Sequence, residues 1–545
     1  MRTLISTSIA FLIILFAAVP AQACSSLLVT KGASQDGSVM ITYTCDGEFH
    51  PILENRPAAD YEAGDSLEIT DWRGKTYGTI AQVKHTYAVV GMMNEHQLAI
   101  GETTFDGREE LHNPNGLLSY WDLIDLALQR ARTAREAITV MTDLVAEYGY
   151  RSTGESFSIG DMHEVWIMEM IGPGEGGQSA QWVALRVPDG YIAAHANKAR
   201  IGTFPLDDPQ NCLYSDNVIS FAVDKGYYDP KSGEPFSFCE AYCPADPKNL
   251  KFCESRVWSF FRRAAPSLNL SSDYNRAVKG AERYPLWIKP DKKLTVGDVF
   301  SLMRDHYEGT EFDLTRGIDA GPYGCPYRWR PLTWMVDSVE YGWERAISTQ
   351  QTAYSFVSQS RSWMVNAIGG VFWYGVDDTW TTCYTPLYCG ITDLPKSYTV
   401  GSGQEFSWES AWWVFNLAAN YANLKYSYMM PEIEALRAEI EGNYLKLQPA
   451  VEKQALILAE SDPQMLTQFL TDYSVSHGEQ LVERWRELTV HLITKYNDGY
   501  VKDETGRARD KGYPESWLKQ VLKERPGHFR LKERQAGVPE SKLTD

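Results

Sequence analysis

The residue best placed to do chemistry is Cys24, which directly follows Ala21-Gln22-Ala23. A signal peptidase reads small residues at such positions, so cleavage after Ala23 would make Cys24 the first residue of the mature chain. A free α-amine has a pKa of about 7.7 to 8.0 and a thiol one of about 8.5, so both groups of a terminal cysteine titrate near neutral pH. The amine can take the thiol's proton, and the thiolate can attack an amide carbonyl. We therefore predict that Cys24 is the nucleophile of an amide-hydrolysing enzyme and that its own amine is the base.

The segment before Cys24 is typical of a secretory signal peptide. It contains one cation, Arg2, an apolar run over residues 9–19 and the helix-breaking Pro20. The run is shorter than the roughly 20 residues of a membrane-spanning helix, and no later segment is long and apolar enough. We expect residues 1–23 to be removed and the mature protein to be soluble in the periplasm or outside the cell.

A cysteine after a signal peptide can also be lipidated. Lipoprotein signals usually have leucine three residues before the cysteine, whereas this chain has Ala21 there. An N-terminal nucleophile is therefore the preferred interpretation. The alternative is a lipidated binding protein without turnover.

The sequence after Cys24 predicts a β-hairpin that would bring a carboxylate to it. Two runs rich in apolar and β-branched residues, 25–30 and 38–43, flank the turn Asp36-Gly37. Because a hairpin brings its two ends together, Asp46 should lie near the new terminal amine. Asp46 could also simply end a strand.

A second hairpin is expected from residues 87–92 and 98–102, with Asn94 at its corner. Residues 156–159 and 165–168 predict a third. Asparagine is common in turns, so Asn94 has a structural interpretation as well as a catalytic one.

A further strand pair is predicted to deliver a second asparagine. The strand at 182–187 is expected to pair across Pro188-Asp189-Gly190 with the strand at 191–194, which leads into His195 and Asn197. A triad of His195 with Cys24 is not needed if the amine is the base, so we interpret His195 as structural.

Helices alternate with these hairpins. They are expected at residues 120–128, from the capping box at Thr133 to Gly149, from 254 to 265, and, beyond residue 408, most clearly at 432–446 and 479–496. The pattern predicts an α+β fold, with a main region over 24–405 and a mainly helical region over 406–545.

The composition excludes several classes of function. With a net charge of −19, binding to nucleic acid or to anionic lipid is disfavoured, and 44% hydrophobic residues indicate a globular chain. The sequence leaves open whether the chain forms a homo-oligomer.

The nine cysteines and the histidines give no metal pattern. Cys239, Cys243 and Cys253 lie close in sequence, but no histidine spacing accompanies them, so we expect local disulfides rather than a metal site. We predict no catalytic metal and no cofactor.

The ordered motifs resemble a known family. They are Cys24-Ser25-Ser26-Leu27-Leu28-Val29, Lys31-Gly32-Ala33-Ser34, Asp36-Gly37-Ser38, Met93-Asn94-Glu95-His96, Gly101-Glu102-Thr103, Ala194-His195-Ala196-Asn197, Ser255-Arg256-Val257-Trp258 and Trp373-Tyr374-Gly375-Val376-Asp377-Asp378. Together they are similar to the dipeptidase A family, cysteine peptidase family 69, of the N-terminal nucleophile hydrolases. That superfamily also contains penicillin V acylase and bile salt hydrolase.

The resemblance implies a role for each candidate residue. Cys24 would be nucleophile and base, Asp46 would hold the α-amine, Asn94 and Asn197 would serve the oxyanion and position the substrate, and Arg256 would stabilise the active cysteine. The implied fold is a four-layer αββα sandwich of antiparallel sheets.

The resemblance also implies an activity, hydrolysis of small peptides by a dipeptidase. An amidase or acylase acting on penicillin V or conjugated bile salts is the alternative. One departure affects the site, because many relatives have an Arg-Asn pair where this chain has Tyr43 and Thr44.

Overall fold

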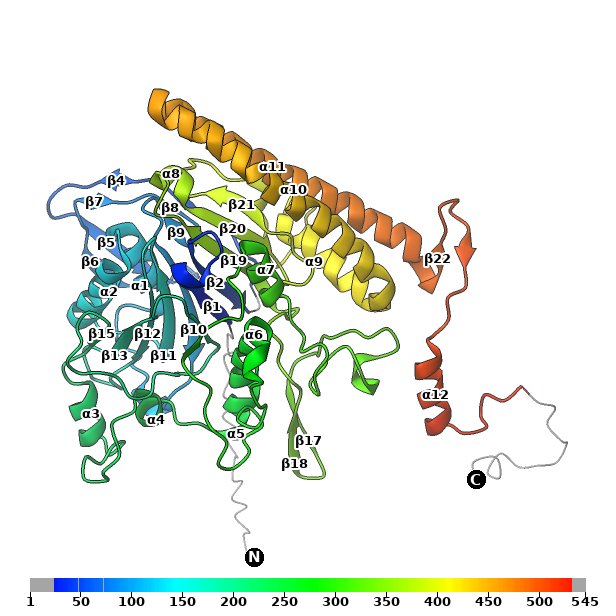
Figure 1. Cartoon of the computed structure of the whole chain (residues 1–545), viewed down its shortest axis with the longest axis horizontal. Helices are drawn as coiled ribbons and strands as arrows, with labels where there is room; N and C mark the ends of the chain where they lie inside the picture. The colour runs from blue at the N-terminus through cyan, green and yellow to red at the C-terminus, as the bar shows by residue number, and fades with distance from the viewer. Residues whose placement is uncertain (1–23, 48, 72, 532–545) are drawn as a thin grey trace, which may run out of the picture.

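A computed structural model describes residues 24–47, 49–71 and 73–531 (Figure 1). The predicted signal peptide, residues 1–23, lies outside the described residues. Two large sheets dominate the described chain, and neighbouring strands within both are antiparallel.

The two sheets have these strands. The seven-stranded sheet runs in the order β16 (Trp287–Ile288), β14 (Ile192–His195), β1 (Ser26–Val29), β2 (Val39–Asp46), β19 (Thr352–Ser360), β20 (Val371–Val376), β21 (Thr385–Tyr388). The eight-stranded sheet runs in the order β15 (Cys212–Tyr214), β13 (Gln181–Arg186), β12 (Val165–Ile171), β11 (Gly154–Gly160), β10 (Ala99–Phe105), β9 (Met93–Asn94), β8 (Val89–Val90), β3 (Asn55–Arg56).

The other elements are helices and short strand pairs. The helices are α1 (Tyr120–Arg130), α2 (Ala134–Tyr148), α3 (Val218–Asp224), α4 (Phe238–Tyr242), α5 (Pro247–Asn249), α6 (Ser255–Ala264), α7 (Val296–Met303), α8 (Asn366–Gly369), α9 (Ala411–Ala422), α10 (Tyr426–Ser461), α11 (Pro463–Tyr496) and α12 (Glu515–Glu524). The short pairs are β4 (Ala59–Asp60) with β7 (His85–Thr86), β5 (Ser66–Thr70) with β6 (Thr76–Ala81), β17 (Thr333–Val336) with β18 (Val339–Gly342), and β22 (Val501–Lys502) with β23 (Ala508–Arg509).

The two large sheets pack face to face with helices outside them. Strand β2 contacts β10 and β11 of the other sheet, α1 and α2 contact β10, β11 and β12, and α6, α7, α9, α10 and α11 contact strands of the seven-stranded sheet. Figure 1 shows these two groups of helices on opposite sides of the sheets. The α+β class and the helical C-terminal region are confirmed, whereas membership of the N-terminal nucleophile fold stays a prediction.

The hairpin predicted after Cys24 is confirmed. Strands β1 and β2 pair with Leu28 opposite Ile41 and Val29 opposite Met40. Every residue of both strands is buried, because one face of the sheet packs on the other sheet and the other face on helices. The nearly continuous apolar sequence of these strands reflects that double burial.

The predicted pairing of residues 182–187 with 191–194 is wrong. Strand β13 pairs with β12 and β15, whereas β14 pairs with β1 and β16 in the other sheet. The turn between them packs against the connection after β1, where Gly32 donates its N–H to Asp189 Oδ1 at 2.6 Å. This turn carries the chain from one sheet to the other, and the crossing puts the end of β14 beside Cys24.

The C-terminal helices are joined to the seven-stranded sheet by a buried ion pair. Glu441 of α10 accepts hydrogen bonds from Arg304, just after α7, and from the backbone N–H of Tyr384 at 2.9 Å. Arg304 also donates to the carbonyls of Thr379 and Thr382. In the part of the chain that the structure describes, no helix combines the length and the apolar character needed to cross a membrane.

Because removing one partner of a buried ion pair leaves the other charge unpaired, we expect Glu441→Gln to lower the free energy of unfolding by about 3 kcal/mol. The matched control is Glu439→Gln on the same helix, whose ion pair with Arg484 leaves the two side chains 53% and 44% exposed. That control should cost less than about 1 kcal/mol. Urea unfolding of both variants measures the difference, and equal losses would contradict the role of the buried pair.

Candidate active site

The backbone nitrogen of Cys24 is held by Asn197. Cys24 precedes β1, and its N–H donates to Asn197 Oδ1 at 2.9 Å. The pairing of β1 with β14 sets Ser26 opposite His195 and so brings Asn197, two residues further, to Cys24. Asn197 has a φ of 57°, which asparagine tolerates better than most residues. Its Nδ2 donates to the Thr104 carbonyl at 2.6 Å, which fixes the direction of Oδ1.

Arg256 binds the same carboxamide from α6. Its guanidinium donates to Asn197 Oδ1 at 2.9 Å, to the Cys24 carbonyl at 2.6 Å and to Ser25 Oγ at 3.0 Å. Burial, together with the charge of Arg345, lowers the pKa of Arg256. The structure thus brings Asn197 to the nitrogen of Cys24 and Arg256 to its carbonyl, whereas the resemblance implied an oxyanion or substrate-positioning role for Asn197.

The thiol side of Cys24 is acidic. Its Sγ lies 3.5 Å from Glu102 Oε1 and 3.7 Å from the Tyr43 hydroxyl, which donates to the same Glu102 oxygen at 2.5 Å. Burial, a hydrogen bond with Cys45 and the charge of Glu102 raise the pKa of the Cys24 thiol well above its usual value. Tyr43 therefore gives the sulfur side of the site an uncharged hydrogen-bond donor.

Our sequence reasoning missed Glu102 as a site residue. It lies on β10 with an exposed fraction of 1%. Glu102 lies in the motif Gly101-Glu102-Thr103, and it is an ionisable residue at the end of the apolar run Leu98-Ala99-Ile100-Gly101. A carboxylate in a buried strand is costly unless it has a function or a partner, so this position was a signal of a site residue.

Asp46 lies near Cys24, but its carboxylate bonds to other groups. Its Oδ2 pairs with Arg345 at 2.8 Å and its Oδ1 accepts from the Thr352 hydroxyl at 2.7 Å. Its negative charge contributes to the raised pKa of the Cys24 thiol. In the described chain the nitrogen of Cys24 is bonded by Asn197, and the predicted contact of Asp46 with a free amine stays a prediction.

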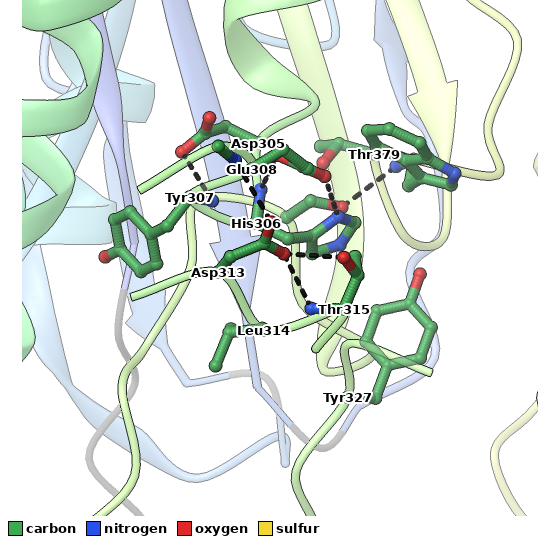
Figure 2. Close-up of polar contacts among 12 residues, drawn as sticks. Asp305, His306, Tyr307, Glu308, Asp313, Leu314, Thr315, Tyr327 and Thr379 are labelled. Carbon is green, nitrogen blue, oxygen red and sulfur yellow. Dashed lines mark hydrogen bonds and ion pairs between the residues drawn. The ribbon is translucent and has the colours of Figure 1, made fainter. Parts of the chain in front are cut away.

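Polar contacts among its own residues hold the segment over residues 305–315, which also contacts Arg345 (Figure 2 shows the contacts within the segment). The Tyr307 hydroxyl donates to the Arg345 carbonyl. The backbone of Tyr307 has a φ of 65°, and the hydrogen bond from its N–H to Asp305 Oδ2, at 3.2 Å, helps to hold this conformation. Beside it, Glu308 accepts from the His306 N–H at 2.8 Å and lies 3.0 Å from the His306 Nδ1. Burial opposes ionisation of Glu308, but its contacts with His306 lower its pKa to about 2.

Asn94 makes structural contacts at the turn before β10. Its Nδ2 donates to the carbonyls of Leu128 and Ala131 at the end of α1, both at 2.8 Å. Its Oδ1 accepts from the N–H groups of His96 and Leu98. These bonds use both N–H groups of the Asn94 carboxamide, so neither is left to donate to an oxyanion. The contacts of Asn94 therefore favour its interpretation as a turn residue and do not support an oxyanion role.

His195 is bonded on both sides of its ring. Nδ1 lies 2.7 Å from Thr103 Oγ1, and Nε2 lies 2.7 Å from Ser158 Oγ. Burial, with the charge of Arg200, lowers the pKa of His195 to about 3. The contacts agree with a neutral, structural histidine.

All nine cysteines are free thiols, so the local disulfides expected among Cys239, Cys243 and Cys253 are not formed. Cys253 instead lies 3.3 Å from the Asn197 carbonyl. Among the described residues, no cluster of three or more His, Cys, Asp or Glu side chains could hold a metal ion.

Comparison with known proteins assigns the chain to a family. A sequence model described as peptidase family C69 matches residues 55–439. A probable dipeptidase of Salmonella dublin is 26% identical over 68% of this chain and 81% of its own length. A probable dipeptidase of Latilactobacillus sakei is 24% identical over 87% and 94%, and dipeptidase A of Lactobacillus helveticus is 20% identical over 87% and 96%. The matched region includes Asn94, Asn197 and Arg256 and begins after Cys24 and Asp46.

The depressed pKa of His195 predicts acid sensitivity. An unfolded histidine binds a proton below about pH 6.5 whereas the folded one stays neutral down to about pH 3, so stability falls as pH decreases through this window. Between pH 6 and 4.5 this group should remove about 2 kcal/mol from the free energy of unfolding. The variant His195→Gln should lack that loss in urea unfolding, whereas His163→Gln, on the exposed surface, should keep it. An unchanged pH slope in His195→Gln would contradict the assignment.

Proposed function

The chain belongs to peptidase family C69, and on this premise we propose that it is an exported cysteine dipeptidase whose nucleophile is Cys24 after cleavage behind Ala23. The observation that carries the proposal is the enclosure of Cys24, with Asn197 and Arg256 on its nitrogen and carbonyl and Glu102 on its sulfur. The names of the relatives support a dipeptide as the substrate.

A base is needed to activate the thiol. Burial and neighbouring negative charge raise the pKa of the Cys24 thiol, so the sulfur is protonated at neutral pH. His195 is occupied by Thr103 and Ser158. The α-amine that cleavage would release belongs to Cys24 itself, next to the thiol, which makes it the base that best fits the site.

The surroundings of the nitrogen favour a neutral amine. Arg256 and the Cys24 nitrogen both donate to Asn197 Oδ1, so a guanidinium lies next to the amine. A nearby positive charge disfavours the ammonium form and lowers the pKa of the amine. The bond to Asn197 would also orient the amine, which leaves its lone pair for the thiol proton.

The reaction proposed has two halves. In the first, the amine takes the thiol proton, sulfur attacks the peptide carbonyl, and the amine returns the proton to the leaving nitrogen as the C–N bond breaks. In the second, the amine takes a proton from water, the hydroxide attacks the thioester, and the amine returns the proton to sulfur as the C–S bond breaks, which regenerates the thiol and the free amine. Asn197 and Arg256 hold the nucleophile in position throughout.

Export and processing are part of the proposal. The apolar run after Arg2 and the small residues before Cys24 support a signal peptide, and an N-terminal base requires its removal. The proposed location is the periplasm or the exterior of the cell.

The variant Cys24→Ala should lower kcat/KM for dipeptides by a factor on the order of 10⁴ or more, since the nucleophile is lost, without changing the melting temperature. Cys212→Ala, which removes a buried thiol on β15 outside the site, should retain wild-type activity. N-terminal sequencing of the wild type should begin at Cys24.

The same assays separate the alternatives. Hydrolysis of penicillin V or conjugated bile salts with no turnover across a dipeptide panel would indicate an acylase. An intact mass that shows an acylated Cys24 would indicate a lipidated binding protein. Wild-type dipeptide hydrolysis by Cys24→Ala would refute the nucleophile assignment.

Arg256→Lys keeps the positive charge but loses the planar fork that joins Cys24, Ser25 and Asn197. Because a small displacement of the nucleophile is costly, we expect kcat to fall about 100-fold while KM changes little. Steady-state kinetics on one dipeptide measures both constants, and an unchanged kcat would contradict the positioning role.

A further inference from the structure

A pair of buried glutamates lies next to the reacting sulfur. Glu102 of β10 and Glu155 of β11 are 1% and 0% exposed, and one oxygen of each, Glu102 Oε2 and Glu155 Oε1, has no hydrogen-bond partner other than the carboxyl group of the other glutamate. The remaining oxygens are bonded: Glu102 Oε1 accepts from Tyr43, and Glu155 Oε2 accepts from Thr104 Oγ1 at 3.0 Å. In the part of the chain described, no lysine, arginine or histidine forms an ion pair with either glutamate.

Of the two carboxyl groups, Glu155 is the one that more strongly retains its proton. Burial, the charge of Glu102 and a hydrogen bond with Glu102 raise the pKa of Glu155 well above its usual value. Burial also raises the pKa of Glu102, against hydrogen bonds from Glu155, Tyr43 and Cys24 that favour its ionised form. Glu155 is therefore the neutral acid that donates to the Glu102 carboxylate.

A buried carboxylate without a cation is costly, and the fold supplies only uncharged donors here. Tyr43, which donates to Glu102 Oε1, is one of these uncharged donors. A positive charge on a bound ligand would complete the site.

A dipeptide brings such a charge to the correct place. In a free amino terminus, the ammonium nitrogen is about 2.5 Å from the carbonyl carbon of the same residue. For attack, that carbon must approach the sulfur to about 3 to 3.5 Å. With Glu102 Oε1 at 3.5 Å from Sγ, these distances allow an ammonium beside the attacked carbonyl to reach hydrogen-bond distance of the carboxylate.

We propose that Glu102, supported by Glu155 and Tyr43, binds the free α-ammonium of the substrate and so selects peptides cleaved after their first residue. This inference rests on the proposed function and deepens it, because it names the group that separates a dipeptidase from an acylase. N-acylated and desamino compounds would leave Glu102 buried without a cation. A site that loses such a partner rejects the analogue strongly.

The test uses a matched pair of compounds, alanylalanine and propionylalanine, which differ only in the α-ammonium. For the processed wild type we expect the inhibition constant of propionylalanine, as a competitor, to exceed the KM of alanylalanine by about 100-fold or more. If the inhibition constant of propionylalanine equalled the KM of alanylalanine in the wild type, the proposal would be overturned, whatever the variants show.

Variants then locate the effect. Glu102→Gln should raise the KM of alanylalanine about 100-fold and change the inhibition constant of propionylalanine by less than about threefold. Glu102→Asp, which keeps the charge, should restore the ratio of the propionylalanine inhibition constant to the alanylalanine KM to at least about a tenth of its wild-type value. Glu110→Gln, an exposed glutamate, controls for the loss of one acidic charge and should leave both constants unchanged.

The outcomes are distinguishable from failure of the proposed function. A processed wild type that hydrolyses no dipeptide refutes that function and this inference with it. A wild type that hydrolyses alanylalanine, with Glu102→Gln either keeping its KM or weakening both compounds alike, refutes the inference alone. Equal weakening of both compounds would indicate that Glu102 acts on the Cys24 thiol or on folding and not on the substrate ammonium.

Discussion

The antiparallel pairing of β1 with β14 is the constraint on which the site depends. It carries Asn197 to Cys24, and the Asn197 oxygen then accepts from the Cys24 nitrogen and from Arg256. A carboxamide oxygen has two lone pairs, so these donors use its full capacity. Because Nδ2 is bonded to the Thr104 carbonyl, the carboxamide cannot turn over without losing three bonds. Segments more than 50 residues apart in the chain thus meet at one side chain.

Charge is distributed unevenly around Cys24. Arg256 lies on the nitrogen side, and Glu102 with its protonated neighbour Glu155 lies on the sulfur side. In a water-poor interior these charges act strongly, so the first favours a neutral amine and the second a neutral thiol. The resting state of the processed enzyme would therefore be the neutral pair, in which the base is ready and the nucleophile is not yet ionised.

The sequence predicted the parts of this arrangement that depend on local pattern. The hairpin after Cys24 followed from two apolar runs around Asp36-Gly37. Asn197 and Arg256 were named as site residues only through the family resemblance, which did not give the contact of Asn197 with the Cys24 nitrogen. The sequence did not predict which sheet β14 joins, because a run of buried residues indicates a strand but not its partner. The contacts of Asn94 with α1 and the approach of Glu102 to the sulfur depend on packing between segments, which no local spacing encodes.

The acidic side of the thiol also suggests how binding and activation are coupled. The charge of Glu102 is among the causes that raise the pKa of the Cys24 thiol. An ammonium bound to Glu102 would offset that charge and would itself favour a negative sulfur nearby, so the pKa of the thiol would fall when the substrate binds. Proton transfer to the amine would then become favourable only with a peptide in place. A compound without the ammonium would be bound weakly and would also meet a less reactive sulfur, so the two effects reinforce each other in the transition state.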